Sequence, residues 1–151
     1  MIVTSIFNFK GGILKSSTSL SMAYLLAEKG YKVLLIDADA QANSTDTLGY
    51  SPDDLDFTLY EILTSGATVK QAAVSANKQN LKYDLLPASP ELFNAERDCK
   101  RSVSRDRLLD QALKKAGNDY DFAIIDCAPH FSFVTLNALM ASDFIIIPCE
   151  P

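Results

Sequence analysis

The side chains best suited to chemistry lie near the start of the sequence, in the stretch FNFKGGILKSST at residues 7–18. Gly11 and Gly12 precede Lys15 and Ser16, and an apolar run comes before them. A glycine-containing turn between a strand and a helix offers backbone N–H groups and the positive end of the helix dipole to phosphate. Lys15 would reach the β- and γ-phosphates of a nucleotide, and the Ser16 hydroxyl would bind Mg²⁺.

This turn departs from the strict phosphate-loop pattern G-x-x-x-x-G-K-[ST] at two positions, Phe9 and Leu14. Glycine suits the position of Leu14 because the backbone there approaches phosphate closely and can need torsions that a side chain disfavours. On this pattern alone, a glycine-rich turn with an incidental lysine explains the sequence about as well as a working phosphate site. A second signal is needed to choose between them.

Three aspartates supply that signal. Asp37 and Asp39 close the apolar run at 32–39, and Asp126 closes the run at 120–128. Ligands of open α/β sheets bind at the carboxyl ends of the strands, so we expect these aspartates near Lys15 and Ser16. Carboxylates placed there would hold magnesium and orient water. Any one aspartate is more simply a helix cap, but all three together with the loop favour a nucleotide site.

The elements that would position these residues follow from the apolar pattern. Buried strands are predicted at residues 2–9, 32–39, 81–88, 120–128 and 143–151. Helices are predicted at 15–29, from the capping box at Thr58, from Ser89, at 104–116 and at 131–141. Alternating strands and helices predict an α/β fold, a doubly wound, mostly parallel sheet with helices on both faces.

Composition narrows the class of protein. The 151 residues are 48% hydrophobic and carry a net charge of −5, which suits one globular domain and disfavours DNA binding through the whole surface. The three cysteines are widely spaced, which argues against a disulfide framework or a zinc site. The start of the chain has no secretory signal, so we expect a cytoplasmic protein. The basic stretch at 100–115 is mixed with aspartates and is interpreted as a solvated helix face.

Four segments together resemble one family. KGGILKSS resembles the deviant Walker A loop of the ParA/MinD ATPases, usually KGGxGK[ST][ST], with Lys10 as the signature lysine. VLLIDADAQAN, YDFAIIDCAP and TLNALMASDFIIIP resemble the segments that follow in that family. The resemblance runs from Met1 to Pro151, and DADAQAN favours the ParA/Soj partition branch over the MinD branch.

The resemblance implies a role for each matching residue. Lys15 would bind phosphate in its own subunit, and Lys10 would reach the nucleotide of a partner subunit. Asp39 would orient the attacking water, so that Lys10, Lys15 and Asp39 form the expected catalytic set. Ser16, Asp39 and Asp126 would hold Mg²⁺, with Asp126 acting through water. The cradle for ATP would be Gly11, Gly12, Ile13, Leu14, Lys15, Ser16 and Ser17.

The resemblance also implies a function: an ATPase for plasmid or chromosome partition. ATP would drive formation of a homodimer that binds DNA non-specifically, and a ParB-like centromere-binding protein would stimulate slow, Mg²⁺-dependent hydrolysis on the nucleoid, without a membrane. The alternatives are a nucleotide-binding module that does not hydrolyse ATP and a MinD-like membrane-associated positioning ATPase. Because family members run on beyond this length, residues 1–151 are expected to be one incomplete P-loop nucleotide-binding domain, with the DNA-binding surface in the missing C-terminal part.

Leu14 is the main departure from the family pattern. A strained leucine would weaken the loop, whereas a leucine in a comfortable torsion would pack against apolar neighbours. Ile13, Phe7 and Phe9 surround it in sequence, so we expect Leu14 to pack beside the loop and to point away from phosphate. On that expectation Leu14→Gly lowers stability and does not tighten ATP binding.

Overall fold

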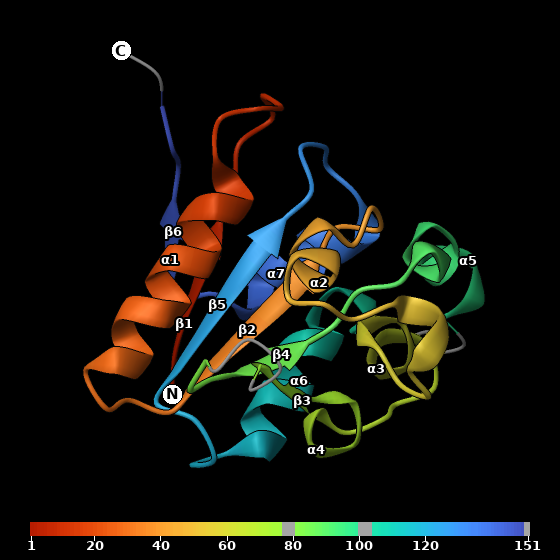
Figure 1. Cartoon of the computed structure of the whole chain (residues 1–151). Coiled ribbons are helices and arrows are strands. Elements are labelled where there is room, and N and C mark those ends of the chain that lie inside the picture. Colours follow the sequence, from red (N-terminus) through yellow and green to blue (C-terminus); the bar gives the residue numbers. More distant parts are fainter. Residues whose placement is uncertain (77–80, 100–103, 150–151) are drawn as a thin grey trace.

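The computed structural model describes residues 1–76, 81–99 and 104–149. Its strands form one sheet in the order β3-β4-β2-β5-β1-β6 (Figure 1). All neighbouring pairs are parallel except β3 and β4, which are antiparallel. The strands are β1 (Ile2–Ile6), β2 (Val33–Ala38), β3 (Val74–Ser75), β4 (Asp84–Leu86), β5 (Phe122–Cys127) and β6 (Phe144–Ile146).

Helices connect the strands and cover both faces of the sheet. In Figure 1, α1 crosses in front of the sheet and α7 lies behind it. The α-helices are α1 (Lys15–Glu28), α2 (Asn43–Thr47), α3 (Leu59–Thr64), α4 (Val69–Ala72), α5 (Ala95–Asp98), α6 (Leu108–Ala116) and α7 (Phe133–Ala141). Short 3-10 helices are η1 (Pro52–Asp54), η3 (Pro90–Asn94) and η4 (Arg105–Arg107).

Two separate apolar clusters form the core, one on each face of the sheet. One cluster joins strand side chains to α1, and the other joins strand side chains to α3, α6 and α7. Within β2, Leu35 belongs to the first cluster, while Leu34 and Ile36 belong to the second. A strand that is buried on both faces has a continuous apolar sequence, which explains the residues VLLI of β2. The doubly wound, mostly parallel fold expected from the sequence is confirmed.

The expected elements lie where the sequence placed them, with shorter bounds. The capping box is present: the Glu61 carboxylate accepts from the Thr58 backbone N–H at 2.7 Å. Gly30 follows α1 with φ of +91°, as expected of a helix stop. Helices α2 and α4 and the short η1 were not predicted, and two further differences remain. The short edge strand β3 carries no apolar run, and the segment after Ser89 begins as η3 instead of an α-helix.

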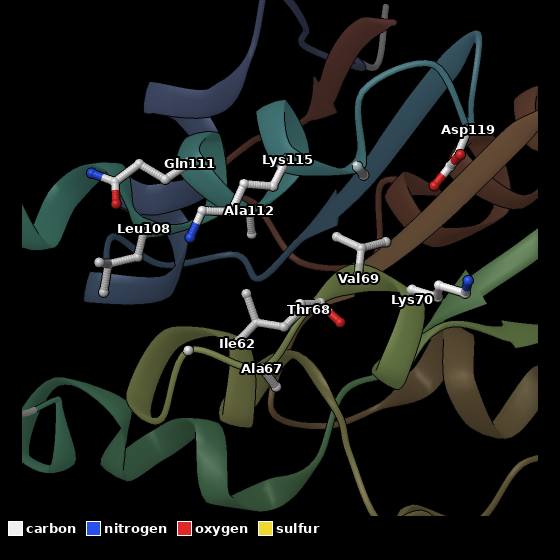
Figure 2. A pocket seen from close by; sticks show the side chains of 12 residues that line it. Ile62, Ala67, Thr68, Val69, Lys70, Leu108, Gln111, Ala112, Lys115 and Asp119 are labelled. Carbon is white, nitrogen blue, oxygen red and sulfur yellow. The ribbon is translucent and has the colours of Figure 1, made fainter.

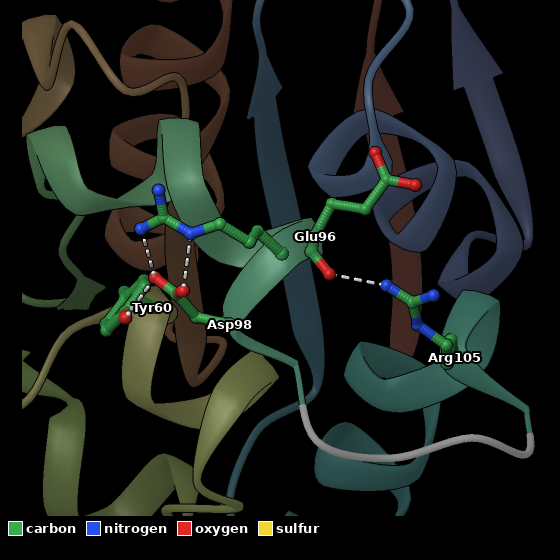
Figure 3. Close-up of polar contacts among 5 residues, drawn as sticks. Tyr60, Glu96, Asp98 and Arg105 are labelled. Carbon is green, nitrogen blue, oxygen red and sulfur yellow. Dashed lines mark hydrogen bonds and ion pairs between the residues drawn. The ribbon is translucent and has the colours of Figure 1, made fainter.

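Side chains from neighbouring elements hold α5, α6 and α7 together. The buried Asn137 of α7 accepts from the backbone N–H groups of Leu108 and Leu109, at 2.8 and 3.3 Å, and so caps α6 from outside. Arg105 donates to the carbonyl oxygen of Glu96 (Figure 3). Its guanidinium also lies 5.4 Å from the centre of the Phe133 ring.

The basic stretch therefore makes contacts within the chain. Besides Arg105, Lys114 pairs with Asp110 at 2.8 Å, as expected for a solvated helix face. Figure 3 also shows Asp98 accepting from Tyr60 and pairing with its neighbour Arg97. Residues 100–103 of this stretch lie outside the described residues. Across the described part of the chain, no helix combines the length and apolar character needed to cross a bilayer.

Candidate functional site

The first loop (residues 7–14) connects β1 to α1 at the carboxyl end of the sheet. The side chain of Asn8 fixes its start, accepting from the Lys10 N–H at 3.0 Å and donating to the Pro148 carbonyl at 2.9 Å. Gly12 has φ of +74°, and a Cβ there would meet no heavy atom within 4 Å. Helix α1 begins at Lys15 without a side-chain cap. No side chain at its cap position therefore competes with an anion for the first N–H groups.

Lys15 folds back over this loop. Its side chain is buried, with 8% of the residue exposed, and the ammonium donates to the Lys10 carbonyl at 2.9 Å. A buried ammonium loses most of its hydration, and a neutral carbonyl replaces only part of that lost solvation. An anion held by the loop would supply the interactions that the buried ammonium lacks. The position of Lys15 therefore favours phosphate binding over the alternative of an incidental lysine.

Leu14 does not pack as expected from the sequence. It has φ of 60° and ψ of 27°, the left-handed conformation, and it is 70% exposed. Its neighbours Ile13 and Phe7 are buried instead, and the Phe9 ring meets Phe7 edge to face while staying exposed. The expectation of a comfortable, packed Leu14 is wrong because the turn into α1 requires positive φ at this position. Such a conformation costs a leucine about 1–3 kcal/mol.

Asp37 and Asp126 lie side by side on the neighbouring strands β2 and β5 and are almost fully buried. Burial and the nearby charge of Asp126 raise the pKa of Asp37 to about 7. Burial also raises the pKa of Asp126, while hydrogen bonds from Ser44, Ser16 and Ser19 oppose the rise. Two buried carboxylates that resist ionisation together create a place where a nearby cation is favourable.

Asp39 follows β2 and is half-buried at the end of the sheet. Its Oδ1 accepts from the Gln41 N–H at 2.9 Å, and its own N–H donates to Asp37 Oδ1 at 3.2 Å. Asp39 lines the same hollow as the first loop. The structure therefore brings Asp39 and Lys15 together across two different connections of the sheet.

A hollow of about 310 Å³ unites most of the expected site. Its lining includes Gly11, Gly12, Leu14, Lys15, Ser16, Ser17 and Asp39 from the sequence-based set. Lys10, Ile13 and Asp126 do not line it. Ile13 is buried, and Lys10 contributes its carbonyl to Lys15.

Three lining residues were missed by sequence reasoning: Asn43, Cys127 and Pro129. Asn43 comes shortly after Asp39, and Cys127 and Pro129 come shortly after Asp126. Extending the candidate site along the chain from these aspartates would have included all three residues. Burial raises the pKa of Cys127 to about 12, so its thiol stays protonated. A protonated thiol is a poor nucleophile, so Cys127 is a buried residue at the end of β5 and not a reactive one.

The residues at the hollow suit a magnesium ion that is held mainly by phosphate and water. Among residues 1–76, 81–99 and 104–149, no group of three or more His, Cys, Asp or Glu could hold a metal ion. Magnesium commonly takes one or two protein oxygens and completes its shell with phosphate and water. Ser16 and Asp39 line the hollow and suit that arrangement. Asp126 accepts from Ser44 at 2.6 Å and Ser19 at 3.4 Å, which leaves it suited to act through water.

A second hollow, of about 250 Å³, lies between α6 and the segment that joins α3 to α4 (Figure 2). Apolar side chains such as Ile62, Val69 and Leu108 face it, and Lys115 extends beside them. None of the residues expected to bind nucleotide lines this hollow. The residues expected to bind nucleotide therefore lie away from this second hollow.

The fold and the first loop define a P-loop nucleotide-binding protein, in which a turn after the first strand leads into a helix that begins at the ligand site. The family model described as an AAA domain (AAA_31) matches residues 1–151, and the chain belongs to this family. The resemblance to ParA/Soj-type partition ATPases is confirmed by the relatives that it matches.

One such relative is the sporulation initiation inhibitor protein Soj of Bacillus subtilis (strain 168), 38% identical over 98% of this chain and 58% of its own. A cobyrinic acid a,c-diamide synthase from Mycobacterium smegmatis, solved with an ATP analogue and magnesium, superposes with a TM-score of 0.92 at 36% identity, over 99% of this chain and 60% of that one. A plasmid partition protein from Borrelia burgdorferi gives 0.83 at 31% identity, over 97% and 63%. This chain thus spans about three fifths of the length of these proteins.

The strain at Leu14 generates a stability prediction. Leu14→Gly should raise the free energy of unfolding by roughly 1 kcal/mol, because relief of about 1–3 kcal/mol of strain exceeds the entropic cost of about 0.4–1 kcal/mol in the unfolded chain. The exposed side chain has little packing to lose. Gly12→Ala is the matched control, since it places a side chain at positive φ in open space and should destabilise. Denaturant unfolding of both variants is the measurement, and a Leu14→Gly variant less stable than wild type contradicts the strain.

Proposed function

We propose that this chain is the nucleotide-binding part of a ParA-like partition ATPase. The observation that carries the proposal is the single hollow that joins the buried Lys15, the Ser16 hydroxyl and the Asp39 carboxylate. The bound ATP analogue and magnesium of the Mycobacterium smegmatis structure support ATP and Mg²⁺ as ligands. The names of the partition relatives support the biological role.

Binding and chemistry are assigned to different residues. The N–H groups of residues 11–17 and the Lys15 ammonium would hold the phosphates of ATP, using charge that is fixed before the nucleotide arrives. Magnesium, when bound, would neutralise charge on the β- and γ-phosphates. Asp39 would orient the water that attacks the γ-phosphate, from a loop that does not form the cradle. Lys10 would reach across to the nucleotide of a second subunit.

The larger cycle is proposed from the resemblance to partition proteins. ATP would stabilise a homodimer that binds DNA non-specifically through segments beyond residue 151, and so associates with the nucleoid. A ParB-like centromere-binding protein would stimulate slow hydrolysis and release. Phosphate release by the full-length protein tests the enzymatic part: nucleotide binding without any release would instead favour a binding module that does not hydrolyse ATP.

Lys15→Ala should weaken nucleotide binding by roughly 10- to 150-fold, because a hydrogen bond to a charged group contributes about 1.5–3 kcal/mol. The measurement is calorimetric titration with ATP and Mg²⁺. Lys29→Ala, which removes an exposed lysine at the other end of α1, is the control and should bind as wild type does. An unchanged affinity in Lys15→Ala would sink the assignment of this lysine to phosphate.

Asp39→Ala should keep ATP affinity, since Ser16, phosphate and water still hold Mg²⁺. It should lose hydrolysis by roughly 100-fold or more, because positioning water matters for the transition state and not for ground-state binding. Single-turnover phosphate release alongside a binding titration separates the two effects. Asp53→Ala removes an exposed aspartate of η1 and serves as the control. If Asp39→Ala loses binding as severely as Lys15→Ala, then Asp39 is a binding residue and the proposed role is wrong.

Lys10→Ala should bind ATP within about twofold of wild type, since the carbonyl that holds Lys15 belongs to the backbone and survives the substitution. The ATP-dependent dimer and its hydrolysis should both weaken, because the exposed side chain at the loop entrance is assigned to the partner's nucleotide. Sedimentation of the full-length protein with ATP is the measurement. A dimer of undiminished strength would contradict the cross-subunit role.

A further inference from the structure

Two adjacent hydroxyl residues, Ser44 and Thr45, open α2 and are fully buried. A hydroxyl at the position just before a helix commonly caps that helix, but in α2 this position is held by Ala42, which is left-handed with φ of 54°. The Ser44 and Thr45 side chains instead point into the sheet. Their burial therefore stabilises something other than the helix end.

Each hydroxyl contacts one of the two buried carboxylates. Ser44 Oγ donates to Asp126 Oδ2 at 2.6 Å, and Thr45 Oγ1 donates to Asp37 Oδ2 at 2.8 Å. The Thr45 backbone N–H adds a second bond to the same oxygen of Asp37 at 2.8 Å. These two side chains thus fasten the start of α2 to both β2 and β5.

Asp37 holds the other end of the second loop (residues 39–42) as well. Its Oδ1 accepts from the Asp39 N–H at 3.2 Å, while its Oδ2 holds Thr45. One buried carboxylate therefore fixes both the first residue of the loop, Asp39, and the first turn of the helix that follows it. Thr45 Oγ1 also accepts from the Ala88 N–H at 3.0 Å, so the same hydroxyl reaches the segment after β4.

We propose that Ser44 and Thr45 form a positioning clamp, which sets the place of Asp39 at the nucleotide hollow and ties the second loop to the segment after β4. Thr45 is the main member because its hydroxyl both donates and accepts. The clamp itself rests on the contacts above, and its effect on hydrolysis rests on the proposed ATPase function. Neither residue touches the hollow, so each acts through Asp37 or Asp126.

The test removes the Thr45 hydroxyl while keeping its shape. In full-length Thr45→Val, exchange of the Ala88 and Asp39 amide hydrogens should quicken by about tenfold or more, because the Ala88 N–H loses its acceptor and Asp37 loses a donor. The kcat for ATP should fall by about tenfold, while the Kd for ATP stays within about twofold. Thr45→Ser keeps the hydroxyl and should restore both quantities. Thr47→Val, two positions along α2 with an exposed hydroxyl bonded to Asn43, is the matched control.

The possible results test the clamp and the proposed ATPase function separately. Unchanged exchange at Asp39 in Thr45→Val overturns the clamp, and quickened exchange with unchanged kcat overturns its role in positioning. A wild type that hydrolyses no ATP sinks the proposed function, while the Asp39 exchange still decides the clamp. If Thr45→Val does not fold, Ser44→Ala removes one donor without adding volume. Unchanged kcat and unchanged exchange at Asp39 in that variant overturn the proposal.

Discussion

The structure depends on the burial of two carboxylates side by side at the carboxyl end of a parallel sheet. Asp37 and Asp126 are in register on β2 and β5 and out of water, and the charge of Asp126 opposes ionisation of Asp37. Such an arrangement persists only where hydrogen-bond donors surround it. Ser19 from α1, and Ser44 and Thr45 from α2, supply those donors. The helices that frame the site are therefore fastened to the sheet by the same groups that make the site attractive to a cation.

The helices differ in what satisfies the backbone N–H groups of their first turn. Helices α3, α4 and α7 carry side-chain caps from Thr58, Thr68 and Ser132. Helices α1 and α2 instead begin after the left-handed residues Leu14 and Ala42, with no side-chain cap. A cap satisfies the same N–H groups that would bind an anion. Helix α1 accepts backbone strain in place of a cap, and this leaves its first N–H groups available to a ligand. In α2 the Thr45 N–H is instead held by the Asp37 carboxylate.

The sequence was informative where a residue's neighbours along the chain decide its environment. The strands, the capping box at Thr58 and most of the loop that lines the hollow follow from local pattern alone. Leu14 was predicted wrongly because its backbone torsion is set by how β1 meets α1, and the apolar residues beside it suggested packing. The roles of Ser44 and Thr45 could not be predicted from the sequence, because the aspartates that their hydroxyls contact come close only when the sheet has formed. The edge strand β3 was missed because two residues carry no periodicity.

Asp126 explains how two independent loops form one site. It lies on β5, which pairs with β1 on one side and β2 on the other. The first loop leaves β1 and the second leaves β2, so neither needs to contact the other along the chain. Asp126 accepts from Ser19 of α1 through one oxygen and from Ser44 of α2 through the other. Asp126 thereby fixes where α1 and α2 begin relative to each other, and so helps to bring Lys15 and Asp39 to the same hollow.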